Sequence, residues 1–301
     1  MSGFDADWLA LREPADRAAR SLELERRFGE AVHDLRGLRP GPLRLIDLGG
    51  GTAANFRALA PRLGGDQHWL LCDHDPALLA AVPVGITRWA QAHGWSVDSR
   101  ADAIEVRTAD GLWRLETRAI DLAADLEAID AGGADGIATT AFLDLVSEAW
   151  LERLARWVIK ADRPLLATLT VDGERRWSPS LPDDELIDSA FRSHQGGDKG
   201  FGDSIGPGAA QAFARILEAL DCRCEVARSD WRIDHQSGVF LQTMAREAAM
   251  VAGEVMPAER DRIARWLAAR EQGIEAGDTE LIVGHLDLLA LPGTRLARRV
   301  S

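Results

Sequence analysis

One stretch, residues 43 to 75, constrains the fold of this chain more than any other. It reads LRLIDLGGGTAANFRALAPRLGGDQHWLLCDHD. A short apolar run, Leu43 to Leu48, ends at three consecutive glycines, and a helix-forming run follows from Ala53 to Leu63. A second apolar run, Trp69 to Cys72, then ends at Asp73. This order predicts the first half of a nucleotide-binding α/β unit: a strand, a glycine turn, a helix, a second strand and an acid.

The two acids of this stretch indicate the kind of ligand. Glycines let backbone N–H groups approach a ligand closely, and Asp73, at the end of a strand, is placed to accept hydrogen bonds from ribose hydroxyls. A dinucleotide-binding G-x-G-x-x-G pattern would need glycine at position 54, where Ala54 stands. Asp47 lies two residues before the first glycine, and its charge would repel a pyrophosphate. A cationic ligand such as S-adenosylmethionine suits Asp47 better.

At these residues the chain resembles the class I S-adenosylmethionine-dependent methyltransferases, whose first motif reads roughly acid-x-Gly-x-Gly-x-Gly. The stretch from Asp47 to Ala53 differs from that pattern in having alanine at the third glycine. The resemblance covers residues 43 to 171 well and the last strands more loosely. It implies a doubly wound, Rossmann-like α/β sheet of seven strands, with the last strand antiparallel, and S-adenosyl-L-methionine as the cofactor. An ordinary tight strand–helix turn is the alternative.

The resemblance also implies cofactor contacts further along the chain. After a β-hairpin expected around residues 103 to 120, Asp121 matches the acid that contacts adenine, although it also suits the N-cap of a helix. His74 would pack near the ribose or face solvent, and Thr139 to Phe142 would line the methionine side. The expected cofactor-binding residues are Asp47, Gly49, Gly50, Gly51, Asn55, Asp73, His74, Asp121, Leu122, Thr139 and Thr140.

The acceptor side of the site is expected after the central strand and in a polar, glycine-rich insertion around residues 172 to 208. Long polar segments inside a compact domain are usually functional or disordered, so a surface loop remains the alternative. The expected substrate-binding residues are Asp144, Asp198, Lys199 and Phe201. If the reaction needs a general base, His194 is the first candidate, because histidine titrates near neutral pH, followed by Asp144 and His285. A buried, hydrogen-bonded His285 is the structural alternative.

Residues 1 to 42 predict a helical cap and a linker in front of a methyltransferase domain that spans residues 43 to 301. Arg12, Arg17 and Arg20 cluster in this cap. Two interpretations stay open: a helix that covers one face of the sheet, and a lid over the cofactor. A helical insertion is expected around residues 238 to 273, before the last strand.

Composition and charge limit the kinds of partner that the chain is expected to bind. The net charge of −13 and a pI of about 5.0 disfavour nucleic acid, since the sequence has no basic run to override them. There is no apolar run of about 18 residues and no secretory signal, so no membrane partner is expected. Three cysteines without a C-x-x-C pair indicate buried thiols in a reducing cytoplasm, and no metal site is predicted.

The sequence therefore predicts methyl transfer from S-adenosylmethionine to an O, N or C nucleophile of a small molecule. Two alternatives stay open. A protein methyltransferase would have a broad open groove, and a Rossmann-like nucleotide-binding protein would lack methyltransferase activity. The oligomeric state is not predicted.

Overall fold

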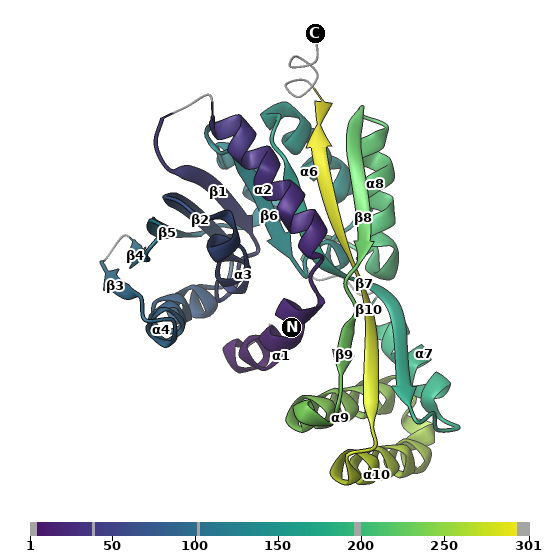
Figure 1. Ribbon diagram of the computed structural model, residues 1–301. Helices are drawn as coiled ribbons and strands as arrows, with labels where there is room; N and C mark the ends of the chain where they lie inside the picture. The colour runs from purple at the N-terminus through teal and green to yellow at the C-terminus, as the bar shows by residue number, and fades with distance from the viewer. Residues whose placement is uncertain (1–4, 38–39, 101–102, 196–199, 294–301) are drawn as a thin grey trace.

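A single twisted sheet organises the molecule (Figure 1). The computed structural model describes residues 5–37, 40–100, 103–195 and 200–293, with the backbone alone for 193–195. Ten strands of these residues pair in the order β3-β4-β5-β2-β1-β6-β7-β10-β8, and β9 pairs with β10. The strands are β1 (Leu43–Leu48), β2 (Gln67–Asp73), β3 (Ser96–Ser99), β4 (Ile104–Arg107), β5 (Leu112–Ala119), β6 (Gly136–Thr140), β7 (Leu165–Ser178), β8 (Cys222–Arg228), β9 (Trp231–Ile233) and β10 (Glu280–Pro292).

The five central strands, β5-β2-β1-β6-β7, are parallel, and β10 runs antiparallel between β7 and β8. This order is that of the class I methyltransferase Rossmann-like fold, and it confirms the predicted doubly wound sheet with an antiparallel last strand. β3, β4 and β9 are additional to the seven strands of that fold. The direction of winding reverses between β1 and β6, and ligands of open α/β sheets bind at the carboxyl ends of strands at such a switch point.

Helices cover both faces of the sheet. The α-helices are α1 (Ala6–Ala19), α2 (Leu22–Arg36), α3 (Ala54–Leu63), α4 (Pro76–Ala92), α5 (Leu122–Asp125), α6 (Glu148–Ala161), α7 (Asp184–Gln195), α8 (Ala209–Glu218), α9 (Gly238–Val255) and α10 (Arg260–Ala276). Side chains of a strand alternate between faces, so Leu45 packs with α2, α3 and α4, while Leu48 packs with α6 and α8. The central strands are buried on both faces, as their apolar runs predict.

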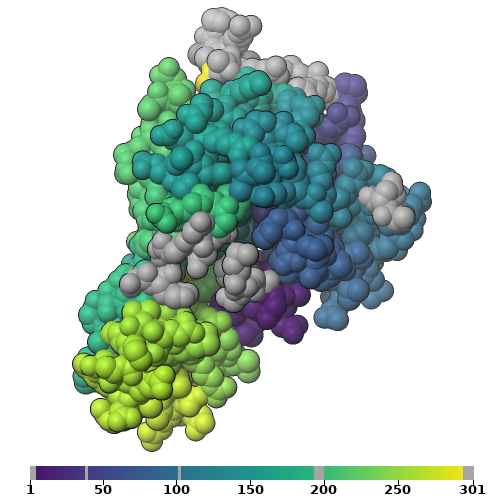
Figure 2. All heavy atoms as spheres, turned by 180° about the vertical axis from the view of Figure 1, so that it is seen from behind, coloured from purple at the N-terminus to yellow at the C-terminus, as the bar shows by residue number. Residues whose placement is uncertain are grey.

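β7 and β10 continue beyond the parallel sheet as a ribbon that carries a second hydrophobic core. Trp177, Trp231 and Trp266 lie in this core, which α7, α9 and α10 complete. Figure 2 shows α9 and α10 in a lobe that projects from the α/β body. The lobe places residues of the ribbon and of α1 beside the carboxyl edge of the sheet.

The insertion expected around residues 172 to 208 contains regular elements, because β7 runs to Ser178 and α7 follows it. α4 accommodates Pro83 in its interior.

Candidate functional site

The glycine turn after β1 lies at the switch point of the sheet. The backbone N–H groups of Gly49 and Gly50 both donate to Cys72 O, at 2.8 and 3.1 Å. Gly49 has a φ of 65°, and a Cβ there would lie 2.8 Å from the Phe142 ring, so the position requires glycine. Ala53, at the third-glycine position, has a φ of 68°, which costs a residue with a side chain roughly 1–2 kcal/mol. The alanine therefore keeps the left-handed backbone of the motif.

Asp47 is fully buried beneath this turn. Its Oδ1 accepts a hydrogen bond from Asn55 at 2.8 Å, and Asn55 in turn accepts one from Arg20 at 2.8 Å. Its Oδ2 is buried without a hydrogen-bond partner among the described residues. Burial raises the pKa of Asp47 to about 7, although Asn55 and Arg20 act in the opposite direction. One carboxylate oxygen is therefore left for a donor that the described chain does not supply.

Asp73, at the end of β2, faces the same turn. Its Oδ2 accepts from the Gly51 N–H at 2.8 Å, and its Oδ1 accepts from the Asp75 N–H at 2.9 Å. The residue is 6% exposed. His74 is largely exposed, with Nδ1 3.5 Å from Asp73 Oδ1. The acid is held rigidly at the edge, whereas the histidine lies in solvent at its rim.

Asp121 and Leu122 open α5 beyond β5. Asp121 is exposed and caps the helix, accepting from the Ala123 N–H at 2.8 Å, which is the structural alternative considered for it. Leu122 is buried, and its carbonyl accepts from Trp150 Nε1 at 3.0 Å. Capping occupies one oxygen of Asp121, and the other remains available at the surface.

Two threonines end β6 at the same edge. The Thr139 hydroxyl donates to Leu48 O at 2.8 Å and so ties β6 to β1. The Thr140 hydroxyl accepts from the Thr168 hydroxyl at 3.0 Å. Only Thr140 is partly exposed, so it is the one of the pair that a ligand can reach.

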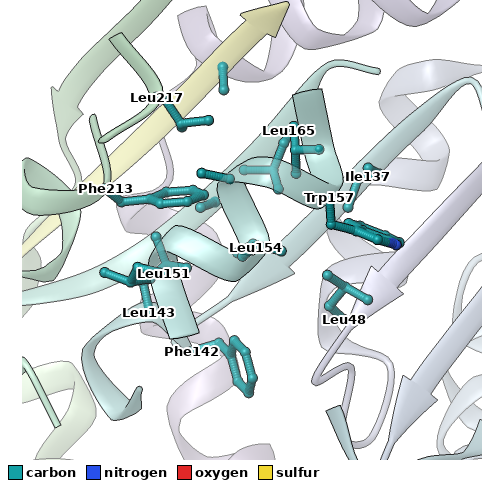
Figure 3. Packing of buried hydrophobic residues seen from close by; sticks show 14 of the residues in the cluster. Leu48, Ile137, Phe142, Leu143, Leu151, Leu154, Trp157, Leu165, Phe213 and Leu217 are labelled. Atoms are coloured by element: carbon teal, nitrogen blue, oxygen red, sulfur yellow. The ribbon is translucent and has the colours of Figure 1, made fainter. Parts of the chain in front are cut away.

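An aromatic cluster covers the glycine turn on one side. Phe142 packs edge-on against Trp150 at 5.4 Å and against Phe201 at 5.4 Å between ring centres. Figure 3 shows Phe142 at the margin of the hydrophobic cluster of α6 and α8. Phe201 therefore lies against Phe142, whose ring is close to Gly49, although Phe201 and Gly49 are 152 positions apart in the sequence. This contact places the segment after α7 over the candidate site.

Asp144 and His285, two candidates for the acceptor side, lie on different elements. Asp144 lies in the 3₁₀ turn Leu143–Leu145 that follows β6, and His285 lies on β10 opposite Val171 of β7. Asp144 Oδ1 is buried and has no hydrogen-bond partner among the described residues. Burial raises the pKa of Asp144 to about 6. Burial lowers the pKa of His285 to about 4, and the charge of Arg12 acts in the same direction.

The charge of Arg12, a residue of α1, acts on both Asp144 and His285. Its Nε and Nη2 donate to Asp16 at 2.9 and 3.1 Å, and its guanidinium lies 4.9 Å from the centre of the Trp231 ring. Trp231 Nε1 also donates to Asp16 at 2.9 Å, and the indole packs against His285 at 4.6 Å between ring centres. The guanidinium is fixed by a carboxylate and an indole.

α1 lies directly over the glycine turn. A Cβ on Gly51 would lie 3.3 Å from Leu9 Cδ1, and Glu13 forms a two-point ion pair with Arg57 of α3. A cavity of about 10 Å³ remains between α1 and α3. Its lining consists of Glu13, Asp16, Arg17, Arg20, Ala54, Ala58 and Thr140. α2 packs on one face of the sheet, and α1 lies over the glycine turn.

Asp287, like His285 on the same strand, is buried and hydrogen-bonded, which for His285 is the structural alternative considered for it. Asp287 Oδ2 accepts from the Ser21 N–H at 2.7 Å, and its Oδ1 accepts from the Leu169 N–H at 2.8 Å. Leu169 has a left-handed φ of 58°, next to an irregularity in the pairing of β7 with β10. Asp287 therefore fixes the turn between α1 and α2 on the sheet, and with it the position of Arg20.

Three expected acceptor-side residues cannot be placed. His194 belongs to α7 by its backbone, but its side chain is outside the described residues, as are Asp198 and Lys199 entirely. Other groups were missed from the sequence, namely the Glu13–Arg57 pair and the chain from Arg20 to Asn55. Their only sequence signal is the arginine cluster of the first helix, which does not reveal partners 35 to 44 residues away.

In the described ranges no helix is long and apolar enough to cross a membrane. Within the same ranges no three His, Cys, Asp or Glu side chains lie close enough together to hold a metal ion.

Comparison with known proteins gives similarity in structure only. No protein-family model matches the sequence, and no curated protein matches it. The structure is similar to that of a phosphoethanolamine N-methyltransferase from Haemonchus contortus, with 12% identity and a TM-score of 0.42. That match covers 96% of this chain and 58% of the other, so the chain spans little more than half of that protein.

Two further structural neighbours have nearly the same length as this chain. A sarcosine dimethylglycine methyltransferase from Galdieria sulphuraria has 12% identity and a TM-score of 0.42, with 95% of this chain and 98% of that chain covered. An S-adenosylmethionine-dependent methyltransferase from Geobacter sulfurreducens, in complex with S-adenosylhomocysteine, has 15% identity and a TM-score of 0.41, with 93% and 96% covered. At this similarity the fold assignment rests on the strand order of the sheet.

Proposed function

We propose that this chain transfers a methyl group from S-adenosylmethionine to a small-molecule acceptor. The observation that carries the proposal is the convergence of Asp47 and Asp73 on the glycine turn at the switch point, with Asp47 Oδ2 buried and without a hydrogen-bond partner in the part of the chain that the structure describes. An unpaired buried carboxylate oxygen is costly, and a cationic group of a ligand would offset that cost. The α-ammonium of the cofactor is such a group.

The hydrogen-bonding and charged groups at the carboxyl edge of the sheet fit the cofactor. Each oxygen of Asp73 accepts one backbone N–H and keeps a further lone pair, so the carboxylate can still accept from both hydroxyls of a ribose. Asp121 would use its second oxygen for the exocyclic amine of adenine, beside Leu122. Gly49 to Gly51 and Thr140 would face the methionine part, and Asn55 would hold Asp47. Arg17 and Arg20 line the adjoining cavity and would attract the carboxylate of the cofactor.

The cavity between α1 and α3 measures about 10 Å³, whereas ligand pockets for molecules of this size measure about 300–1,000 Å³. If part of the cofactor enters this cavity, α1 would shift and the Glu13–Arg57 pair would rearrange. Closure of α1 afterwards would exclude water from the donor and the acceptor.

The cofactor supplies an electrophilic methyl group, and the residues of this chain hold and align the reactants. Alignment in a dry site accounts for much of the catalysis that a protein can give such a transfer. Asp144, in the turn that follows β6, would lie on the acceptor side of the methyl group.

Isothermal titration calorimetry of the full chain with S-adenosylmethionine and with NAD tests this proposal. We expect binding of S-adenosylmethionine and none of NAD. Asp73→Ala should weaken binding about 10- to 100-fold, since hydrogen bonds to a charged group are worth about 1.5–3 kcal/mol. Asp73→Asn tests the charge while keeping an acceptor for Gly51, and Asp98→Asn, on an exposed strand, is the control. Absence of S-adenosylmethionine binding, or unchanged affinity in both Asp73 variants, contradicts the proposal. Binding of NAD alone would favour the nucleotide-binding alternative.

A further inference from the structure

We propose that Arg20 is a positioning residue of the candidate site, which acts through Asn55 to present Asp47 to the ammonium group of the cofactor. This inference rests on the proposed function, because it takes the ligand of Asp47 to be that ammonium. It goes further in giving a role to an arginine at the junction of α1 and α2, which lies 35 positions before Asn55 in the sequence.

The side-chain amide of Asn55 has one orientation that suits both of its neighbours. A guanidinium can only donate, so the Asn55 atom that lies 2.8 Å from Arg20 Nη2 is the carbonyl oxygen, Oδ1. The other end of the amide, Nδ2, then donates to Asp47 Oδ1 at 2.8 Å. With the amide turned over, its N–H₂ group would face the guanidinium and its oxygen would face the carboxylate, and both contacts would be repulsive. Arg20 therefore determines which end of Asn55 meets Asp47.

This orientation leaves the second oxygen of Asp47 for a ligand. Oδ1 is occupied by Asn55, whereas Oδ2 is buried and has no hydrogen-bond partner in the described ranges. A Cβ on Gly50 would lie 2.9 Å from Oδ2, so this oxygen lies directly beneath the glycine turn. An ammonium at the turn can therefore bind Oδ2 without displacing Asn55, which is 1% exposed.

Arg20 is held in place by contacts that need no ligand. Its Nε donates to Glu25, and the two side chains are 2% and 1% exposed. Glu25 also forms an ion pair with Arg62. The next residue, Ser21, is tied to β10, because its N–H donates to Asp287 at 2.7 Å. The relay from Arg20 to Asp47 is therefore ordered before binding, which reduces the entropy that binding costs.

The charge of Arg20 also favours the ionised form of Asp47, which is the form that binds an ammonium. Burial raises the pKa of Asp47 to about 7, whereas the hydrogen bond from Asn55 and the charge of Arg20 act to lower it. The other titratable groups that interact with Asp47 or Arg20 are Cys72 and Asp73 of β2, Asp16 of α1 and Asp287 of β10. Arg20 thus contributes both the orientation of Asn55 and a charge that keeps the carboxylate ionised.

Calorimetric titration of the full chain with three related probes tests this role. The probes are S-adenosylhomocysteine, its decarboxylated form, which keeps the ammonium, and its deaminated form, which keeps the carboxylate. Arg20→Met and Asn55→Ala should each weaken binding of the decarboxylated probe about 10-fold, because a hydrogen bond that orients a charged group is lost. Asn55→Ala should leave affinity for the deaminated probe within about 2-fold. The double variant should lose no more than the weaker single variant, because both residues act on the same carboxylate.

The pH dependence gives a readout that packing alone would not change. Affinity for the decarboxylated probe should fall as the pH drops through about 7, because Asp47 becomes protonated, and in Arg20→Met the fall should begin at a higher pH. Removal of one partner of a buried ion pair is destabilising, so Arg20→Met combined with Glu25→Met is used if the single variant does not fold. Arg26→Gln, on the exposed side of α2, is the control, and the melting temperature of each variant reports folding.

Several outcomes would overturn the inference. These are unchanged affinity for the decarboxylated probe in either single variant, and losses that multiply in the double variant. A loss in Arg20→Met that is confined to the deaminated probe would also overturn it, because Arg20 would then act on the carboxylate alone. Failure of the proposed function is distinguishable, because it appears as absence of S-adenosylhomocysteine binding by the unmodified chain.

Discussion

Replacement of Asp47 by asparagine should change how the stability of the protein depends on pH. Asp47 is 0% exposed, and burial raises its pKa from 3.8 to about 7. A carboxyl group with a raised pKa in the folded state stabilises that state while it is protonated. That contribution is fully present below the unfolded pKa and is lost as the pH rises through the folded pKa. Asp47→Asn removes the titration and keeps the shape of the side chain.

The size of the effect follows from the interval between the two pKa values. One pKa unit corresponds to about 1.36 kcal/mol. As the pH rises from 5, the loss of unfolding free energy grows over about two pH units, until the folded carboxyl group ionises near pH 7. The unmodified protein should therefore lose about 3 kcal/mol of unfolding free energy relative to Asp47→Asn over this range. The new amide can accept from Asn55, but its N–H₂ group points to the position of Oδ2, which has no partner. This cost is the same at every pH, so it does not change how the difference between the two proteins depends on pH.

Urea unfolding of both proteins at pH 5, 6, 7 and 8, followed by circular dichroism, measures the difference. Other titrating groups, Asp144 included, contribute equally to both proteins and cancel. A difference in unfolding free energy that stays constant within about 0.5 kcal/mol across the series would refute the claim that Asp47 is a buried acid without a sufficient counter-charge. Saturation with S-adenosylmethionine should reduce the pH dependence, because an ammonium beside Oδ2 would stabilise the ionised form.

Three other substitutions test the geometry of the edge. Gly49→Ala should destabilise the protein by about 1–3 kcal/mol in urea unfolding, because its φ of 65° and the Phe142 ring at 2.8 Å both oppose a Cβ; retained stability would contradict the turn geometry. Phe201→Ala should cost about 1–2 kcal/mol and speed dissociation of S-adenosylmethionine in stopped-flow measurements, and an unchanged rate would exclude a covering role for this ring. Asp287→Ala should cost about 2–5 kcal/mol, because it leaves the Ser21 N–H and a second buried donor unpaired, and Asp230→Ala at the more exposed neighbouring position is the comparison.

The parts of the site that could be predicted from the sequence depend on local signals. The glycine turn, Asp47 and Asp73 follow one another within 27 residues, and each is encoded by residues next to it. The buried strands were recognisable because parallel strands are apolar on both faces. The antiparallel last strand came from the family resemblance, and the pairing of β10 with β7 confirms it.

The missed elements depend on contacts that are distant in sequence or on broken patterns. The extension of β7 carries Arg175 on the face that the lobe buries, where an ion pair with Asp188 replaces an apolar residue and hides the alternation of a strand. α1 docks through Glu13 and Arg57, and no local pattern reveals that these two side chains meet. The additional edge strand β3 is mostly exposed and has little hydrophobic signal.

The acids of the carboxyl edge differ in a way that only coordinates show. Asp73 and Asp287 each accept two backbone N–H groups, so both oxygens help to hold the fold in the absence of any ligand. Asp47 and Asp144 each keep one buried oxygen without a hydrogen-bond partner among the described residues. Burial raises the pKa of both, as it does that of Asp287. Such groups reduce stability when ionised, so their presence at the switch point is better explained by ligand binding than by folding. Because Asp47 lies below the glycine turn and Asp144 lies in the turn that follows β6, these two oxygens mark two separate positions at this edge of the sheet where a ligand donor could be accommodated.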